Sequence, residues 1–328
     1  MTLPKTLSKD TLRAFRFIVA PFAVLILGKI LFELLAFKFP ELNQSLIAHF
    51  PESKQISSTI NFQESKARLL WATSVIIYFC VCAVFGAFIW NTLRGSMTRS
   101  TLLLFISVAL FFSMAEIIYF FQVDPLKSPL ATIFRFTFDS LNASGQYSEN
   151  ELNIIYIILS MINLLAILVA PFGILTGCCI MHKYHRSSNT TLDDLLSQSK
   201  HIKELLTGGS AIMVIGIAHM QLWLNWPLSF LPEDSVHQQI EAITLAVSQY
   251  WGVLYTLTMA ALYLPAAFSL AEQARRIILS DHNKNPEPWL MENKMLFSLN
   301  AQLPQLITMI APMLLGSFGS TLGNIMPF

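Results

Sequence analysis

Three charged residues interrupt apolar segments of this chain, and their chemistry is the first pointer to a function. Lys29 and Glu33 stand one helical turn apart in one apolar segment, and Glu116 stands in another. Charges are costly inside a bilayer, so such residues are typical of ion paths, proton relays or buried ion pairs. Lys29 has the spacing to pair with Glu33 on its own helix, or it pairs with Glu116 across helices.

Asn163, His219 and Gln249 are polar residues of later apolar segments, and they join the three charged residues in a candidate intramembrane polar cluster. One interpretation is a path for an ion or proton, or a small-ligand site. The other is a set of ion pairs and interhelical hydrogen bonds that fixes helix packing. One acid–base pair with scattered amides suits the packing interpretation at least as well.

The C-terminal segment after Lys294 has no charged side chain, and small residues recur in it. Gly316, Gly319 and Gly323 follow one another at spacings of three or four, so they share one face of a helix expected over about 304–326. Glycine permits close approach of two backbones, which predicts tight packing against another helix or subunit. Pore lining is a second interpretation of this stripe, and a re-entrant or interfacial helix is a third.

No pattern in the chain indicates catalysis. The four cysteines stand in apolar segments, and none has metal-type spacing to a histidine. Nucleotide-binding, nucleophile-elbow and zinc-protease motifs are absent from the sequence. We therefore expect a non-enzymatic protein with no catalytic residue, no metal and no cofactor.

Six apolar segments of the chain must position these residues. They run over about 15–37, 69–91, 102–121, 152–181, 210–226 and 240–271. Most reach the ~20 residues that a helix needs to cross a bilayer, where the backbone must satisfy its own hydrogen bonds. The composition agrees, with 54% hydrophobic and 12% charged residues. The prediction is an all-α, polytopic transmembrane helix bundle in which residues 1–328 form a single membrane domain, with six spans plus a C-terminal membrane-embedded or re-entrant helix.

The basic residues predict the orientation of the bundle. Lys and Arg gather before the first span and after the second, fourth and sixth, as Arg94, Lys203 and Arg275 illustrate. Cytoplasmic loops carry an excess of Lys and Arg, so the N-terminus and these loops are expected in the cytoplasm. The expected location of the protein is the inner cell membrane. The net charge of +1 gives no reason to expect a nucleic-acid partner.

Two connecting segments carry local signals of their own. Thr191 has the character of a helix cap, and the segment 190–206 predicts a short amphipathic helix that Gly208 and Gly209 end. The expected outward loop over 122–151 holds phenylalanines at alternate positions, which indicate an interfacial aromatic segment or, as an alternative, a short strand. Those residues are Phe134, Phe136 and Phe138.

These features favour a channel, pore or transport-type subunit. The alternative is a membrane anchor, sensor or effector or immunity component that acts with a soluble partner, for example in bacterial defence. The expected partners are the lipid bilayer and, as open options, a second copy of the chain and a soluble cytoplasmic protein.

Overall fold

A computed structural model describes the chain over residues 9–36, 58–96, 99–122, 129–185, 190–231, 235–282, 285–296 and 299–325. All regular structure in these ranges is helical, which confirms the all-α prediction for them. The elements are α1 (Lys9–Leu35), α3 (Ser58–Ser96), α4 (Arg99–Gln122), α5 (Pro129–Ala143), α6 (Glu149–His185), α7 (Leu192–Asn225), the short 3-10 helix η1 (Trp226–Phe230), α8 (Ser235–His282), α9 (Glu287–Glu292) and α10 (Leu299–Ile325).

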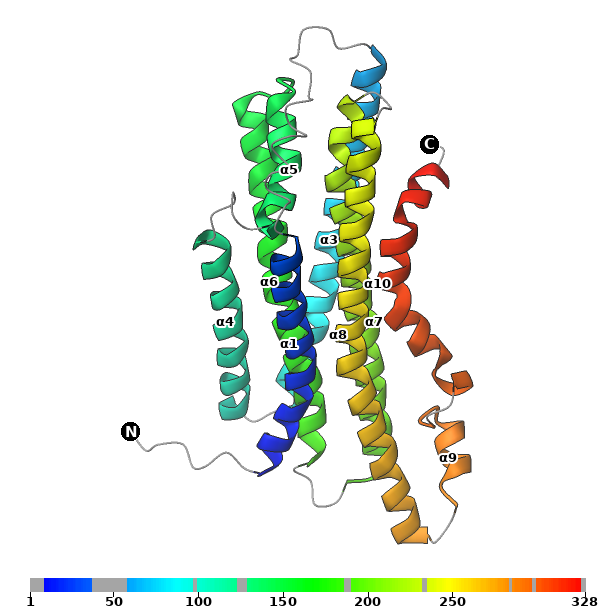
Figure 1. Cartoon of the computed structure of the whole chain (residues 1–328). Coiled ribbons are helices and arrows are strands. Elements are labelled where there is room, and N and C mark those ends of the chain that lie inside the picture. Colours follow the sequence, from blue (N-terminus) through cyan, green and yellow to red (C-terminus); the bar gives the residue numbers. More distant parts are fainter. Residues whose placement is uncertain are drawn as a thin grey trace, which may run out of the picture.

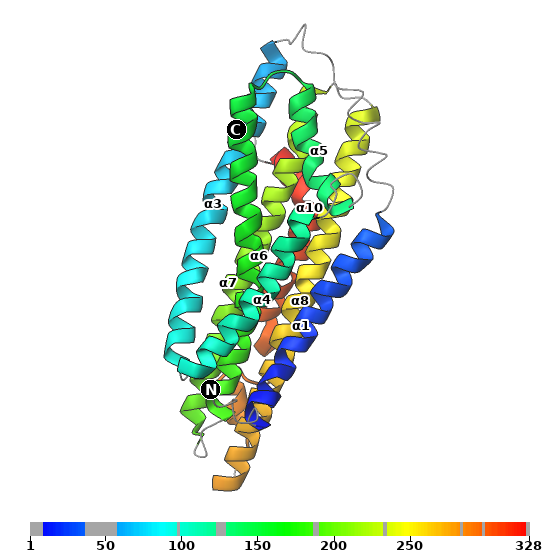
Figure 2. The same ribbon diagram turned by 90° about the vertical axis from the view of Figure 1, so that its left-hand side faces the viewer.

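The long helices lie side by side along one axis and form an elongated bundle (Figures 1 and 2). α8 contacts α10, α7 and α1, whereas α3 contacts α7 and α6. The pair α7 and α8 therefore forms the centre of the bundle. α10 packs on this pair from one side, and α4 reaches the bundle mainly through α6 on the other side.

Successive long helices run in opposite directions, so the bundle has two distinct ends (Figure 1). α3, α6 and α8 end where α1, α4 and α7 begin, at the lower end of the view. This end carries Arg94 in the last turn of α3, Lys200 and Lys203 early in α7, and Arg275 late in α8. We name it the basic end and the other the opposite end. The alternation agrees with the predicted one, and the cytoplasmic location of the basic end stays a prediction.

Four helices have the length and hydropathy to cross a bilayer within the described part of the chain. They are Ile60–Arg94, Glu149–Met181, Leu192–Phe230 and Val236–Ser280. In the apolar stretch of the second helix only 22% of the residues are buried inside the bundle. Large apolar side chains of this helix such as Ile154 therefore face outward, and surface of this kind is stable only when lipid or protein covers it. The four helices support a membrane location.

The predicted count of six spans is not confirmed. α1 and α4 are helices where spans over 15–37 and 102–121 were expected, but the described apolar stretch of α4 is the shorter Leu102–Ala115. The other long helices exceed the predicted spans at one or both ends. α8 has 48 residues, about 72 Å at 1.5 Å per residue, against a hydrocarbon core of ~30 Å. A helix of this length extends well beyond a bilayer.

α7 begins as predicted but does not end as predicted. Thr191 caps it, and a capping box joins this residue to Asp194. The expected short helix over 190–206 is wrong, because α7 continues through Gly208 and Gly209 without interruption.

Packing explains why the two glycines do not end α7. Each glycine costs about 1 kcal/mol in a helix interior relative to alanine. Phe85 of α3 packs in the space that a side chain at Gly208 would take, and Met259 of α8 does the same at Gly209. The glycines therefore allow neighbouring helices to approach α7, and these contacts offset their low helix propensity.

α5 is a helix within the segment that was expected to form an outward loop over 122–151. The strand alternative is therefore wrong, since Phe136 lies inside this helix, where it is buried, and the interfacial location of the segment stays a prediction. The hydroxyl of Thr137 donates a 2.7 Å hydrogen bond to the carbonyl of Trp223. α5 thus packs on the end of α7 rather than lying apart from the bundle.

α10 begins at Leu299, five residues before Pro304, where the helix was expected to start. A second proline, Pro312, lies inside it and has no N–H for the carbonyl of Thr308, four residues earlier. The hydroxyl of Ser210 on α7 donates to that carbonyl at 2.5 Å. A freed backbone group is thereby satisfied by a neighbouring helix, as membrane helices require.

α6 has the same arrangement of a proline and a neighbouring serine. Pro171 lies inside the helix, so the carbonyl of Ile167 lacks its usual donor. The hydroxyl of Ser113 on α4 donates to it at 3.3 Å. In both helices a serine of a neighbouring element meets the carbonyl that a proline has freed, which ties α4 to α6 and α10 to α7.

Candidate functional site

One face of α3 is buried along most of its length, and its chemistry changes part-way. Its buried residues include, from the opposite end to the basic end, Glu64, Trp71, Ser74, Tyr78, Cys82, Phe85, Ile89 and Leu93. Spacings of three, four and seven place them on one side of the helix. The residues up to Cys82 form the polar half of this face, and those from Phe85 onward form the apolar half.

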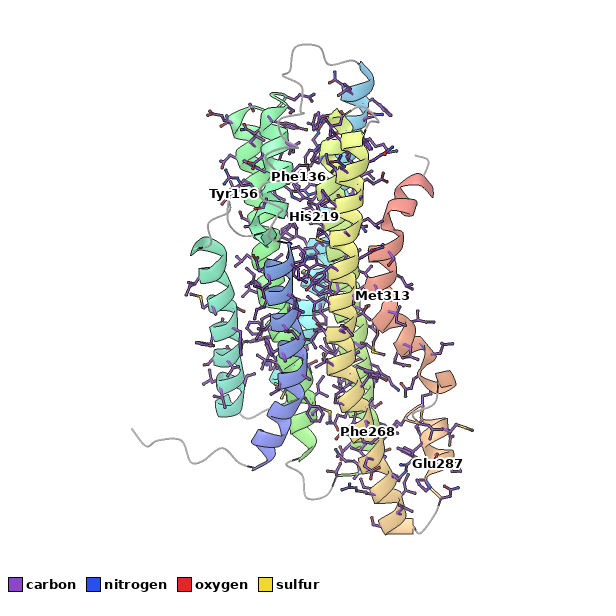
Figure 3. The ribbon with its side chains drawn as sticks, in the orientation of Figure 1. Phe136, Tyr156, His219, Phe268, Glu287 and Met313 are labelled. Carbon is purple, nitrogen blue, oxygen red and sulfur yellow. The ribbon has the colours of Figure 1, made fainter. Side chains whose placement is uncertain are left out.

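His219, one of the residues chosen from the sequence, lies against the polar half. It is buried on α7 in the interior of the bundle (Figure 3). The Ser74 Oγ lies 2.9 Å from its Nδ1 and donates to the Trp71 carbonyl at 2.6 Å. Because a hydroxyl has a single hydrogen, the Ser74 oxygen accepts from Nδ1–H. Nε2 is then the ring nitrogen that can take a further proton, and no described residue forms a hydrogen bond with it.

Three tryptophans surround this serine–histidine pair. The ring of Trp71 lies 6.0 Å from that of His219, 5.5 Å from that of Trp223 and 5.2 Å from that of Trp226, centroid to centroid. These four residues and Ser74 are named the Trp–His cluster. The Nε1 atoms of Trp71 and Trp226 are buried without a hydrogen-bond partner among the described residues. The cluster therefore keeps two donors and one acceptor unused, which costs about 1–3 kcal/mol for each atom if it stays so.

A carboxylate lies between this cluster and the opposite end. Glu64 is buried, accepts a short hydrogen bond from the hydroxyl of Tyr147, and has the Nε of Arg68 at 3.5 Å. The ring of Tyr147 contacts that of Trp226 edge-on at 6.1 Å. Burial raises the pKa of the Tyr147 hydroxyl, and the neighbouring Glu64 carboxylate raises it further. Tyr147 therefore stays protonated and donates to Glu64.

Phe85 begins the apolar half and is held by two glycines. Its ring occupies the space beside Gly208 of α7, and an added Cβ at Gly173 of α6 would lie 3.4 Å from its Cε1. Phe88 stacks near it with ring centroids 6.0 Å apart. The ring thus fills the place where α3, α6 and α7 meet, directly below the last polar residue of the face.

The other members of the predicted polar cluster differ from His219 in burial. Lys29 and Glu33 are half-buried on α1, Asn163 is half-buried on α6, and Gln249 is exposed on α8. The side chain of Glu116 lies outside the described residues, so the predicted pairing with Lys29 stays a prediction. That the six residues form one intramembrane polar cluster therefore stays a prediction.

Gly316 on α10 lies against the backbone of α8. An added Cβ at this position would come 2.5 Å from the carbonyl oxygen of Ser248, and one at Gly252 would come 2.7 Å from that of Pro312. The two helices therefore approach with backbone against backbone, which larger residues would prevent. Gly319 and Gly323 belong to the helical backbone of α10, but their surroundings lie outside the described residues.

Sequence reasoning missed most of the residues around His219. Trp71 and Ser74 are ordinary residues of an apolar segment, and Glu64 precedes the predicted span over 69–91. The available signal was the recurrence of Glu64, Trp71, Ser74 and Tyr78 at helical spacing. It indicates a polar helix face but does not identify the helix that faces it.

Comparison with known proteins found no matching family model, no matching curated protein and no matching solved structure. Among the described residues, no three His, Cys, Asp or Glu side chains come together as a metal site.

Proposed function

We propose that this chain is a non-enzymatic, multi-pass membrane protein of the channel or transport type, in which a proton moves along the seam between α3 and α7. One observation supports the proposal above all. Between Glu64 and Cys82 the buried face of α3 includes side chains with polar atoms, namely Glu64, Trp71, Ser74 and Tyr78, beside the apolar Val75, whereas the buried residues Phe85, Ile89 and Leu93 have none. A polar path that meets an apolar constriction is a known arrangement in gated pores.

His219 is the group that takes up the proton in this proposal. It is buried, Ser74 orients its ring through Nδ1, and Nε2 is the basic nitrogen. Histidine is the side chain whose ordinary pKa is nearest neutrality, so it suits reversible proton transfer. An ionisable residue inside a membrane bundle is by default a candidate for such a role.

Phe85 is the closing element in this proposal. The polar residues end at Cys82, and the next buried position of α3 is the Phe85 ring between α6 and α7. An apolar ring excludes water, and a proton needs water or polar groups to continue. Because glycines line two sides of the ring, a small separation of these helices would release it.

The orientation is part of the same proposal. We expect the basic end in the cytoplasm, because Lys and Arg are in excess in cytoplasmic loops. Glu64 and Tyr147 then face the outer side, where protons enter, and Phe85 separates His219 from the cytoplasm.

Proton movement by the purified chain in vesicles tests the proposal. The vesicles contain a pH-sensitive dye, and an imposed pH gradient should decay faster than in vesicles without protein. Phe85→Leu should increase this rate because a smaller side chain leaves the constriction less complete. His219→Gln should decrease it because an amide does not take up the proton.

Phe62→Leu is the matched control for the phenylalanine change. Phe62 lies on the same helix but is 69% exposed, so its replacement should leave the rate unchanged. A wild-type rate equal to that of empty vesicles, with no response to Phe85→Leu or His219→Gln, would overturn the proposal. Equal effects of Phe85→Leu and Phe62→Leu would show that Phe85 is not the closing element.

A further inference from the structure

A pocket of about 580 Å³ opens at the basic end of the bundle, far along α7 from the Trp–His cluster. One wall is a single face of α7, and the other is the turn after α9. The lining residues are Leu196, Ser199, Lys200, Lys203, Glu204, Thr207, Gly208 and Asn293. The volume lies within the range typical of small-molecule sites, about 300–1,000 Å³.

The charge of this pocket is not balanced. Lys200 has Glu204 at 3.9 Å, so these two side chains neutralise each other. Lys203 is half-buried and has no carboxylate partner among the described residues; its one hydrogen bond there goes to the carbonyl oxygen of Lys294 at 3.2 Å. The ammonium of Lys294 adds a second positive charge nearby. An ammonium group has three donors, so Lys203 keeps two for a ligand.

The turn opposite Lys203 is firmly held. Lys294 has a φ of 52°, in the left-handed region that residues with a side chain rarely adopt. Its carbonyl accepts from Lys203 and also from the Nε2 of Gln302 at 3.3 Å. Gln302 in turn accepts a 2.7 Å hydrogen bond from the hydroxyl of Tyr263. The ammonium of Lys203 is thus fixed at the wall of the pocket before any ligand arrives.

We propose that this pocket binds a phosphate group, with Lys203 as its principal contact. Lysine is a common phosphate ligand and acts as a point charge. Leu196, Gly208 and the methylene stem of Lys203 form an apolar wall beside the charge, which suits the glycerol part of an anionic phospholipid. Basic pockets between helices on the cytoplasmic side of a membrane are known lipid-headgroup sites. The proposal does not depend on proton transport.

Lipid binding by the full chain tests this site. The purified protein is placed in nanodiscs of phosphatidylcholine with or without phosphatidylglycerol, and bound lipid is counted by native mass spectrometry. Wild type should retain phosphatidylglycerol over phosphatidylcholine. Lys203→Gln should reduce that retention at least about tenfold, the loss expected for one hydrogen bond to a charged group. Lys203→Arg, which keeps the charge, should restore most of it.

Lys66→Gln is the matched control, because Lys66 is an exposed lysine of α3 near the opposite end of the bundle. It makes the same change of charge and should leave retention unchanged. In a parallel arm, inorganic phosphate is added to the protein in neutral detergent. Binding of phosphate without a preference for phosphatidylglycerol over phosphatidylcholine would support the phosphate site and identify a soluble ligand as the source of the phosphate. The proposal is wrong if Lys203→Gln and Lys66→Gln behave alike in both arms, or if Lys203→Gln folds normally and retains phosphatidylglycerol as wild type does.

Discussion

The two halves of the buried α3 face differ in how they are held. In the polar half, Ser74 and His219 form a hydrogen bond inside a shell of tryptophan rings, and polar atoms remain unused. In the apolar half, Phe85 fits against glycines of α6 and α7, and no polar atom takes part in that contact. Both halves lie between the same two helices, α3 and α7.

This difference shows that burial along one helix can serve two purposes. An apolar contact against glycine lets a side chain pack closely against a helix backbone. A polar cluster with unused donors and an unused acceptor is less stable than it could be, since each unpaired buried group carries a cost. Costs of this kind are typical of functional sites rather than of packing alone. The polar half is therefore where proton uptake is expected, and the apolar half, which closes the proposed path at Phe85, is where the larger contribution to stability is expected.

The largest effect should follow from removing the ring of Phe85. Phe85→Ala leaves a cavity where three helices meet and should lower the free energy of unfolding by about 3 kcal/mol. Phe62→Ala, at an exposed position of the same helix, should change it by less than about 0.5 kcal/mol. Unfolding in detergent micelles by added denaturing detergent measures both. Similar values for the two variants would show that the apolar half is not the stable one.

Gly208 and Gly86 offer a matched pair of glycines. Gly208→Ala adds a Cβ against the Phe85 ring and should destabilise the protein by about 1–3 kcal/mol. An added Cβ at Gly86 meets nothing within 4 Å, so Gly86→Ala should stabilise the helix by up to about 1 kcal/mol. The same unfolding measurement decides between them. The description of the apolar half fails if Gly208→Ala is also stabilising.

The polar half should respond differently when one partner or both are removed. Ser74→Ala leaves the Nδ1 of His219 without its partner and should cost about 1–3 kcal/mol. Adding His219→Leu removes the second polar group, so the double variant should lose less than the sum of the two single losses. A double-mutant cycle measures this coupling energy. Strict additivity would mean that the hydrogen bond between the two residues contributes nothing.

The smallest effect should appear only in alkaline solution. Burial, and then Glu64, raise the pKa of Tyr147 above its ordinary value of about 10. The unfolded chain loses this proton first as the pH rises, so the stability contributed by Tyr147 is present below about pH 10 and is lost above it, by at most ~1.4 kcal/mol per pH unit.

Tyr147→Phe should remove this part of the alkaline decline, which unfolding curves at a series of pH values can measure. Tyr156→Phe, at an exposed position of α6, should keep the wild-type decline. If wild type and Tyr147→Phe lose stability in parallel above pH 10, the proton of Tyr147 does not contribute to stability.

Much of the fold could be predicted from the sequence. Long apolar segments require helices in lipid, and the capping residues Thr191 and Ser148 mark where α7 and α6 begin. The failures lie where neighbouring helices outweigh local preference. Gly208 and Gly209 signal a helix end in any isolated segment, but contacts from Phe85 and Met259 keep α7 continuous.

The candidate site was predictable only in part. His219 was chosen because an ionisable group in an apolar segment is unusual whatever surrounds it. Ser74 and Trp71 could not be chosen, because serine and tryptophan are common in membrane helices. Their meaning comes from facing His219 across 145 positions of sequence. Gln249 is another polar residue that the sequence indicates within an apolar segment, and it is exposed on α8.

The helical character, the apolar surface and the gathering of basic residues at one end of the bundle follow from composition and periodicity. Each depends on residues near one another in the chain. Composition and periodicity do not predict the Trp–His cluster, the packing of Phe85 against Gly208 and Gly173, or the pocket beside Lys203. Each is made by side chains from different helices, and its chemistry depends on how those helices are rotated and how deeply they are set against one another. Many weak contacts along the whole bundle determine that rotation and depth, and local sequence patterns do not contain them.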